Sequence, residues 1–351
     1  MWFFYVYNNN LGKIKQMNPI KIVFYIFMLL FIGIMIVMGY LTHGEYIRSM
    51  LHNNKSDALM DFFNSIQYGL KPYSRDVIYP PLINVFYGFI GRFTIKDAGT
   101  VAIRVSQLGS VIFLFYSLFS YWLLYYSLNE FSKKYLMKSK EIKLFFCLIL
   151  FSLPFLFMME RGNSIILALS FSMLFLTYYN VKNIKAFICL GIAVSIKITP
   201  CAFALILLRD RKWKEVLVCT IIIFVIFNLP FILTDGNMFT LLNNIINTTN
   251  SFQSEVVGVD GILRKVGYGA YINIGNTIKA IAEILHKDLN YLITPINLFL
   301  LCWATGTILM NRNLNEWKVY TLLCGIITLT PGFSVIYNLI YYIIPLVCFL
   351  S

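Results

Sequence analysis

The sequence predicts an all-α protein that crosses a membrane several times, and its composition supports this in three ways. Hydrophobic residues make up 59% of the 351-residue chain, and only 13% are charged. Soluble domains carry roughly 25% charged residues, so this chain lacks the charge needed to cover a water-facing surface. Apolar runs of about 18 residues or more recur, each long enough to span a bilayer as a helix. We therefore expect one integral membrane domain over residues 1–351.

The charge distribution excludes some function classes. A net charge of +13 would suggest a nucleic-acid partner in a soluble protein. Here Lys and Arg cluster in short loops between apolar runs, as the positive-inside rule describes for cytosolic loops. We therefore expect membrane lipids around the protein and no nucleic acid. The seven cysteines lie in apolar runs and the three histidines are scattered, so we expect no metal site and no cofactor.

The first part of the chain is predicted to begin in the cytosol. Lys13, Lys15 and Lys21 flank the first apolar run, residues 20–41, which therefore leads outward. A long outer loop is expected over residues 42–99. Within it, the apolar patch 82–90 is too short to cross and is expected in the interface. The next helices are predicted over residues 101–128, 144–159 and 164–180. The lysine-rich loop between residues 128 and 144 is the strongest cytosolic signal.

The apolar run 186–208 is long enough for one crossing, but both of its flanks look cytosolic. Lys182 and Lys185 precede it, and a basic loop beginning at Arg209 follows it. If the run forms two half-length helices that meet at the Lys197–Pro200 break, both of its flanks remain on the cytosolic side. Non-helical backbone at membrane depth is tolerated where it is buried in protein or lines a wet cavity. We therefore expect a broken helix pair with Lys197 facing such a cavity.

The last part of the chain is predicted to hold a second outer loop, residues 234–270, and an amphipathic interfacial segment, residues 272–285. Its membrane helices are predicted over residues 216–233, 291–310, 319–330 and 335–350. The whole chain then has about nine to eleven membrane helices, counting the broken pair as two.

Polar residues converge on the predicted outer side, although they come from distant parts of the chain. Asp61 is the candidate general base, because a carboxylate near the interface can take a proton from an acceptor hydroxyl. Asp57 lies one helical turn earlier and would share its face, so the choice between the two stays open. Tyr79 precedes two prolines that fix the local backbone. For any of these residues, a simple loop or cap role is the alternative.

Three further candidates belong to later segments. Arg161 could bind a phosphate through its planar guanidinium group, or could only extend its charge to the membrane interface. Lys197 is a cation within the membrane, which by default indicates a functional site. Its expected partner is a lipid phosphate or one of the acids. Asn163 and Tyr337 complete the polar set on the outer side.

Three stretches resemble glycosyltransferase family 87. They are D-F-F-x-x-x-x-Y-G with Y-P-P-L, then E-R-G-N-S at a helix start, then S-I-K-I-T-P before a basic R-D-R-K-W loop. Asp61, Tyr79, the Gly162–Asn163 pair and the Lys197–Pro200 break occupy the family's positions. The resemblance covers residues 57–213 well. The chain departs from the family in reading Lys-Ile-Thr-Pro where the family has a Lys-Pro break.

The resemblance implies a C-type glycosyltransferase fold and a transfer reaction on the outer face of a bacterial plasma membrane, with a cytosolic N-terminus. The donor would be a polyprenyl-phosphate sugar, with mannose the expected hexose. The acceptor would be a glycan or glycolipid. Lys197 and Arg161 would hold the donor phosphate, and Asp61 would deprotonate the acceptor hydroxyl. Asp57, Tyr79, Asn163 and Tyr337 would contact substrate. An inverting reaction without a metal is expected.

Two other classes of protein remain as alternatives. A polysaccharide polymerase of the O-antigen type is also polytopic, but such proteins have arginine-rich outer loops. A lipid-linked sugar transporter or flippase often has paired broken helices in both halves of the chain, whereas only one broken pair is predicted here.

Overall fold

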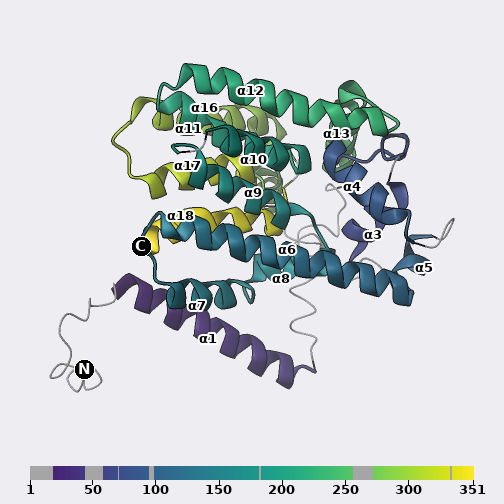
Figure 1. Ribbon diagram of the computed structural model, residues 1–351, viewed down its shortest axis with the longest axis horizontal. Helices are drawn as coiled ribbons and strands as arrows, with labels where there is room; N and C mark the ends of the chain where they lie inside the picture. Colours follow the sequence, from purple (N-terminus) through teal and green to yellow (C-terminus); the bar gives the residue numbers. More distant parts are fainter. Residues whose placement is uncertain are drawn as a thin grey trace.

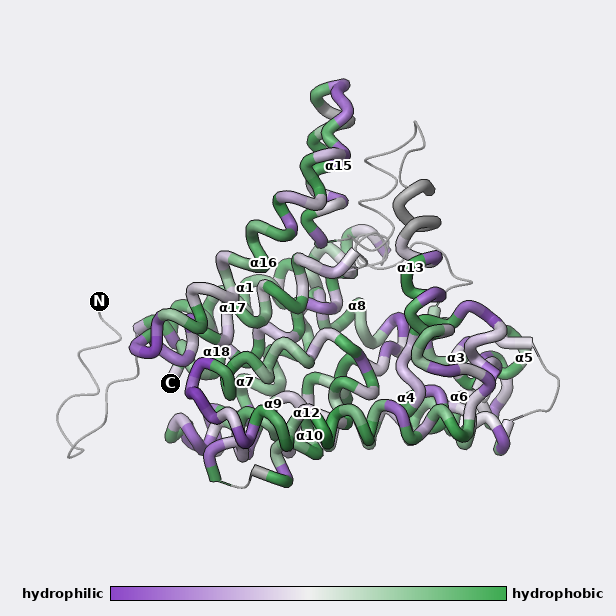
Figure 2. Tube along the Cα trace, turned by 90° about the horizontal axis from the view of Figure 1, so that it is seen from above, coloured by the Kyte–Doolittle hydropathy of each residue, from purple (hydrophilic) through white to green (hydrophobic). Residues whose placement is uncertain are grey.

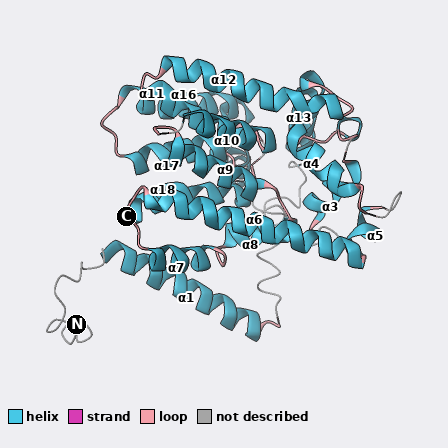
Figure 3. Ribbon diagram, viewed as in Figure 1, coloured by secondary structure: helices cyan, strands magenta, loops and turns pink. Residues whose placement is uncertain are grey.

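The computed structural model describes residues 19–43, 58–69, 71–94, 99–181, 183–255, 272–332 and 334–351. This part of the chain is helical (Figure 1) and contains no β-strand (Figure 3). The prediction of an all-α protein is thus confirmed. The α-helices are α1 (Pro19–Leu41), α3 (Met60–Tyr68), α4 (Pro81–Gly91), α5 (Thr100–Val105), α6 (Gln107–Lys133), α7 (Ser139–Ile149), α8 (Leu153–Arg161), α9 (Ile165–Tyr178), α10 (Asn183–Ile196), α11 (Leu205–Arg209), α12 (Trp213–Asn228), α13 (Met238–Glu255), α15 (Ile274–Leu285), α16 (Ile293–Met310), α17 (Glu316–Leu329) and α18 (Ile343–Leu350). The 3₁₀ helices are η3 (Tyr73–Arg75), η4 (Thr199–Ala204), η5 (Leu229–Leu233), η6 (Asn290–Leu292) and η7 (Ile336–Tyr342).

The centre of the molecule is the pair α9 and α10, which pack against each other. The side chains of α9 are apolar nearly all round, and Ile165, Leu169 and Phe175 are fully buried. A helix that is hydrophobic on every side belongs in the interior. The longer helices α6 and α12 cover this pair, α6 against α9 and α12 against α10 (Figure 1).

Several helices that consist largely of hydrophobic residues (Figure 2) expose apolar side chains at the surface of the molecule. Phe27 of α1, Phe115 of α6, Phe224 of α12 and Phe299 of α16 are all more than half exposed. Within the described residues four helices are long and apolar enough to cross a membrane, or five if the bent pair α7 and α8 forms one span. This supports a membrane protein, but the expected count of nine to eleven membrane helices is not confirmed.

The predicted single helix over residues 144–159 is wrong, because the chain bends there. α7 ends at Ile149, α8 begins at Leu153, and the two helices are bent by 63°. Pro154 explains the break. It has no N–H for a bond to the Leu150 carbonyl, and its ring would collide with that carbonyl in a continuous helix. Proline is tolerated in the first turn of a new helix, where it stands in α8.

The predicted single helix over residues 101–128 is also wrong. α5 ends at Val105 and α6 begins at Gln107, with Ser106 extended between them (φ −73°, ψ 149°). The Ser106 Oγ accepts the N–H of Gly109 at 2.9 Å. Serine at this position satisfies one of the free N–H groups of a new helix and favours its start there. α6 then continues to Lys133, beyond the predicted end.

The run over residues 186–208 folds back on itself, as the charges at its flanks predicted. α10 ends at Ile196, and η4 with α11 follows from Thr199. The Lys212 Nζ, after α11, donates to the Asn180 Oδ1, before α10, at 2.5 Å. Because the two ends of the run are joined by this hydrogen bond, the chain leaves on the side where it entered. The Lys197–Pro200 break lies at the turning point.

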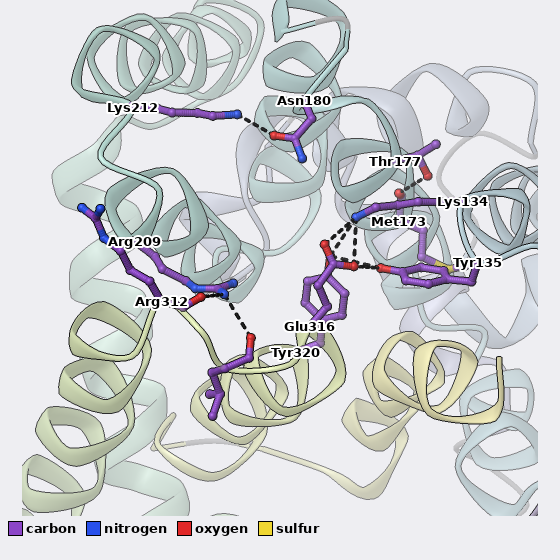
Figure 4. A network of polar contacts seen from close by, with 11 residues as sticks. Lys134, Tyr135, Met173, Thr177, Asn180, Arg209, Lys212, Arg312, Glu316 and Tyr320 are labelled. Atoms are coloured by element: carbon purple, nitrogen blue, oxygen red, sulfur yellow. Dashed lines mark hydrogen bonds and ion pairs between the residues drawn. The ribbon is translucent and has the colours of Figure 1, made fainter.

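The predicted cytosolic loops come together at one end of the molecule, which we call the basic end. Figure 4 shows this network. Lys134, after α6, forms an ion pair with Glu316, at the start of α17, with 3.0 Å between nitrogen and oxygen. The Arg209 Nη2 donates to the Arg312 carbonyl at 2.7 Å. Together with the Lys212 contact to Asn180, these bonds place the predicted cytosolic loops on one side.

Two further segments differ from what the sequence predicted. The patch 82–90, expected in the membrane interface, forms α4, whose residues Ile83, Asn84 and Tyr87 are buried in the protein. The last predicted helix, residues 335–350, begins as the 3₁₀ helix η7 and continues as α18. η7 packs against α8 and α9, so this segment contributes to the interior around the candidate site.

Candidate active site

Asp61 lies in the first turn of α3, and both of its carboxylate oxygens are bound. The Arg161 Nη2 donates to Oδ1 at 2.6 Å, and the Asn163 Nδ2 donates to Oδ2 at 2.6 Å. The Asp61 side chain is 14% exposed and that of Arg161 is 21% exposed. Charge-assisted hydrogen bonds of this kind are about twice as strong as neutral ones. The carboxylate is therefore held in one orientation.

The start of α3 and the end of α8 meet at a junction where two residues have left-handed backbone conformations. Leu59 stands just before α3 in the left-handed region (φ 60°), which is unusual for a residue other than glycine. Its N–H donates to the Glu160 carbonyl at 2.7 Å. Gly162 is also left-handed (φ 66°), and a Cβ there would lie 2.9 Å from the Cβ of Phe62. Only glycine fits this conformation and this close contact without strain.

Tyr79 joins the same hydrogen-bonded group. The amide nitrogen of Asn163 donates its second hydrogen to the Tyr79 hydroxyl at 3.1 Å. The Asn163 side chain is itself oriented by its Oδ1, which accepts the N–H of Ile165 at 3.0 Å. Tyr79 precedes Pro80 and Pro81, and Pro81 opens α4. Since a hydroxyl both accepts and donates, the Tyr79 hydroxyl, for which no acceptor is found among the described side chains, can donate its own hydrogen to a ligand.

Lys197 reaches the site from the break after α10. Its Nζ lies 4.8 Å from the centroid of the Tyr337 ring, a cation–π distance. Among the described residues no hydrogen-bond acceptor contacts this ammonium. The Asp61 carboxylate is close enough for its charge to act on it. Tyr337 stacks on Phe157 of α8, with 6.1 Å between ring centroids. Phe157 lies one helical turn before Arg161 in the same helix.

The structure therefore brings together Asp61, Tyr79, Arg161, Asn163, Lys197 and Tyr337. Asp57 lies outside the described residues. The structure does not test what these six residues do, so their roles remain predictions. We call the region that they form the site end. α9 starts two residues after Asn163 and ends two residues before Asn180, so the site end and the basic end lie at opposite ends of this helix, about 20 Å apart for its length.

Four polar residues that the sequence analysis did not single out, Tyr73, Asn84, Asp235 and Asn244, hold the backbone of Tyr79 and of the η3 turn by hydrogen bonds. The Tyr73 hydroxyl and the Asn84 Nδ2 both donate to the Tyr79 carbonyl, at 3.1 and 2.8 Å. Asp235 accepts the N–H groups of Tyr73 and Ser74, each at 3.0 Å. Asn244 donates to the Tyr73 carbonyl at 3.2 Å. Tyr73 and Asn84 contact Tyr79 locally, six and five positions away. No local motif marks Asp235 and Asn244, because their contacts to the η3 turn span 161 to 171 positions.

Asp235 lies outside the membrane-capable helices, and its ionisation is affected by two opposing effects. Asp235 is exposed, and a small loss of hydration disfavours its charged form, but the N–H groups of Tyr73 and Ser74 stabilise that form and hold the pKa of the Asp235 carboxyl below its usual value. Among the residues that the structure describes, no three His, Cys, Asp or Glu side chains are grouped to hold a metal ion.

Comparison with known protein families identifies the family of the chain. The model of Glycosyltransferase family 87 matches residues 78–257, which is just over half of the chain. The matched stretch contains Tyr79, Arg161, Asn163, Lys197 and Asp235, and Asp61 and Tyr337 lie on either side of it. No curated protein and no solved structure matches the chain. On the strength of the family match, the chain belongs to glycosyltransferase family 87 and is a membrane glycosyltransferase.

Proposed function

We propose that the protein transfers a hexose, with mannose the first candidate, from a polyprenyl-phosphate sugar to a glycan or glycolipid acceptor on the outer face of the membrane. One observation carries this proposal: an oriented carboxylate, Asp61, is ion-paired with Arg161 at 2.6 Å, and its charge also acts on the buried ammonium of Lys197. A sugar transfer with a phosphate leaving group needs both a proton acceptor and positive charge at the phosphate.

In this reaction Asp61 is the base. Each oxygen of a carboxylate has two lone pairs, and the described hydrogen bonds occupy one on each oxygen. A further lone pair can therefore accept the proton of the acceptor hydroxyl. The acceptor oxygen then forms a bond to the anomeric carbon as the bond from that carbon to the phosphate oxygen breaks. A single displacement of this kind inverts the anomeric centre. Glu160 and Asp57 are the rival acids.

Lys197 takes the donor phosphate in this proposal. Its ammonium rests on an aromatic ring and has no hydrogen-bond acceptor among the described residues, so an incoming phosphate oxygen finds three N–H donors. Arg161, which is ion-paired with Asp61, adds further positive charge. The Tyr79 hydroxyl can donate to a sugar or phosphate oxygen. No metal and no cofactor are included in the proposal.

The test uses the full chain in lipid nanodiscs. We would incubate it with mannose, glucose and galactose linked to polyprenyl phosphate, together with acceptor glycolipids, and follow donor loss and product mass. The expected result is consumption of one polyprenyl-phosphate hexose and release of free polyprenyl phosphate. A nucleotide sugar and a polyprenyl-diphosphate sugar are the comparison donors. Consumption of either of these, with all monophosphate donors left intact, would contradict the proposal.

A further inference from the structure

Among the described residues, the segment predicted as the second outer loop binds the segment predicted as the first outer loop at the turn that contains η3. We call the stretch from Asp235 to Asn244 the clamp. At its start, the Asp235 carboxylate accepts two consecutive backbone N–H groups, those of Tyr73 and Ser74. At its end, the Asn244 amide donates to the carbonyls of Tyr73 and Val77, at 3.2 and 3.3 Å. The clamp thus binds both sides of the turn.

Packing reinforces these hydrogen bonds. A Cβ on Gly236 would lie 2.5 Å from the Tyr73 ring, so the clamp backbone lies directly against that ring. The Phe231 ring, from η5, packs on Tyr73 with 5.5 Å between centroids. Tyr73 is 3% exposed and Asn244 is 5% exposed. Buried polar groups that are satisfied in this way hold a single arrangement, because breaking one leaves its partner without a bond.

From Tyr73 the contacts lead to the candidate active site. The Tyr73 hydroxyl donates to the Tyr79 carbonyl and accepts from the Asn84 Nδ2, at 3.1 and 3.3 Å. Asn84 also donates to the Tyr79 carbonyl. The backbone of Tyr79 is therefore fixed from one side by Tyr73 and Asn84. Its hydroxyl is bound on the other side by Asn163, which also binds Asp61.

We propose that the clamp, residues 235–244, is a positioning element of the active site, with Asp235 and Asn244 acting on Tyr79 through Tyr73. The clamp makes none of the described contacts to Asp61, Arg161 or Lys197, so it is not assigned a catalytic role. Its effect on activity rests on the proposed function, in which Tyr79 lies beside the base. Displacement of a positioning group by about 1 Å can cost up to about 10²-fold in rate.

The first measurement does not depend on activity. 3-Fluorotyrosine is placed at position 79 of the full chain, and the ¹⁹F resonance is recorded in nanodiscs. Tyr73→Phe removes only the hydroxyl that bonds to the Tyr79 carbonyl, and Asp235→Asn weakens the hold on the η3 turn. Both variants are expected to shift or broaden the resonance. Asp288→Asn is the matched control, since Asp288 is an exposed loop acid whose carboxylate accepts from Asn290, and it should leave the resonance unchanged.

The second measurement is kinetic. In Asp235→Asn, kcat is expected to fall about threefold to tenfold while KM for the donor stays within about twofold, because a positioning effect acts on the transition state. Asp288→Asn should keep the parental constants. An unchanged Tyr79 resonance in folded Tyr73→Phe and Asp235→Asn would overturn the proposal. If the parental chain transfers no sugar from any polyprenyl phosphate, the proposed function fails, and the resonance alone decides whether the clamp positions Tyr79.

Discussion

Asp61 is the residue on which the proposed chemistry depends, and its two hydrogen-bond partners allow a sharp test. Asp61→Asn keeps the shape of the side chain but removes the proton acceptor. Since general-base catalysis contributes about 10²- to 10⁴-fold, turnover should fall by about that factor while donor binding persists. Turnover by single-turnover kinetics and donor affinity by titration would be measured on the same preparation.

The rival acids provide the control for that substitution. Asp57→Asn and Glu160→Gln should each cost much less than Asp61→Asn. A near-parental rate in Asp61→Asn, together with an inactive Asp57→Asn or Glu160→Gln, would assign the base to another acid.

Lys197 provides a prediction about binding. Lys197→Met keeps the length of the side chain and removes its charge, so affinity for the donor should fall roughly 10- to 100-fold, as expected for loss of a hydrogen bond to a charged group. The melting temperature should change little, because the described contact of the ammonium is an aromatic ring. Lys197→Arg, which keeps the charge, is the matched control. Equal losses of folding and binding in Lys197→Met would indicate a structural role at the break.

At the scale of elements, the junction of α3 with the end of α8 is the most constrained part of the site. Gly162→Ala places a side chain at φ 66° and 2.9 Å from Phe62. The conformation alone costs about 1–2 kcal/mol, and the contact forces α3 away from α8. We expect a lower melting temperature and loss of most activity. Gly306→Ala on α16 is the control, because a Cβ there meets no atom within 4 Å and alanine favours a helix. Equal behaviour of the two variants would contradict the described junction.

The η3 turn has a pH dependence that follows from Asp235. Because the folded protein holds the pKa of this carboxyl below its usual value, the bond stabilises the fold above the unfolded pKa of about 3.9. This stabilisation is lost as the pH falls through the folded value. The melting temperature of the parental chain should therefore exceed that of Asp235→Asn at pH 6, and the two should converge below about pH 4. A difference that grows in acid would contradict this assignment.

Sequence reasoning succeeded for elements whose signal is local. Lys185 and Arg209 flank the 186–208 run on both sides, and this alone indicated that the chain turns back. The helix breaks at Ser106 and Pro154 were missed. Apolar residues continue on both sides of Pro154, and the few polar residues around Ser106 were read as part of one apolar run, although serine favours a helix start and proline interrupts a helix. The support of Tyr79 by Asp235 was also missed, since no pattern along the chain relates residues that distant. Asp61, Arg161 and Lys197 were found because charge is rare in this chain.

At the scale of the whole molecule, the two ends predict a topology. If the basic end is cytosolic, as the positive-inside rule indicates, the site end faces outward. Single cysteines placed near Asp61 and Asn247 should react with a membrane-impermeant reagent in intact cells. Cysteines near Lys138 and Lys212 should react only after the cells are opened. Labelling near Lys138 in intact cells would reverse the orientation of the whole chain.

The fold-back at Lys197 has a consequence for biosynthesis. Each full crossing reverses the side on which the following chain emerges, so the number of crossings decides whether α12 delivers Asp235 to the compartment that holds Tyr73. A full crossing by residues 186–208 would put these two residues on opposite faces of the bilayer, where the bond between them could not form. During translation the ribosome and the insertion machinery must therefore release this apolar stretch without passing it across. In the folded protein, the hydrogen bond from Lys212 to Asn180 joins the two flanks of this stretch on the same side.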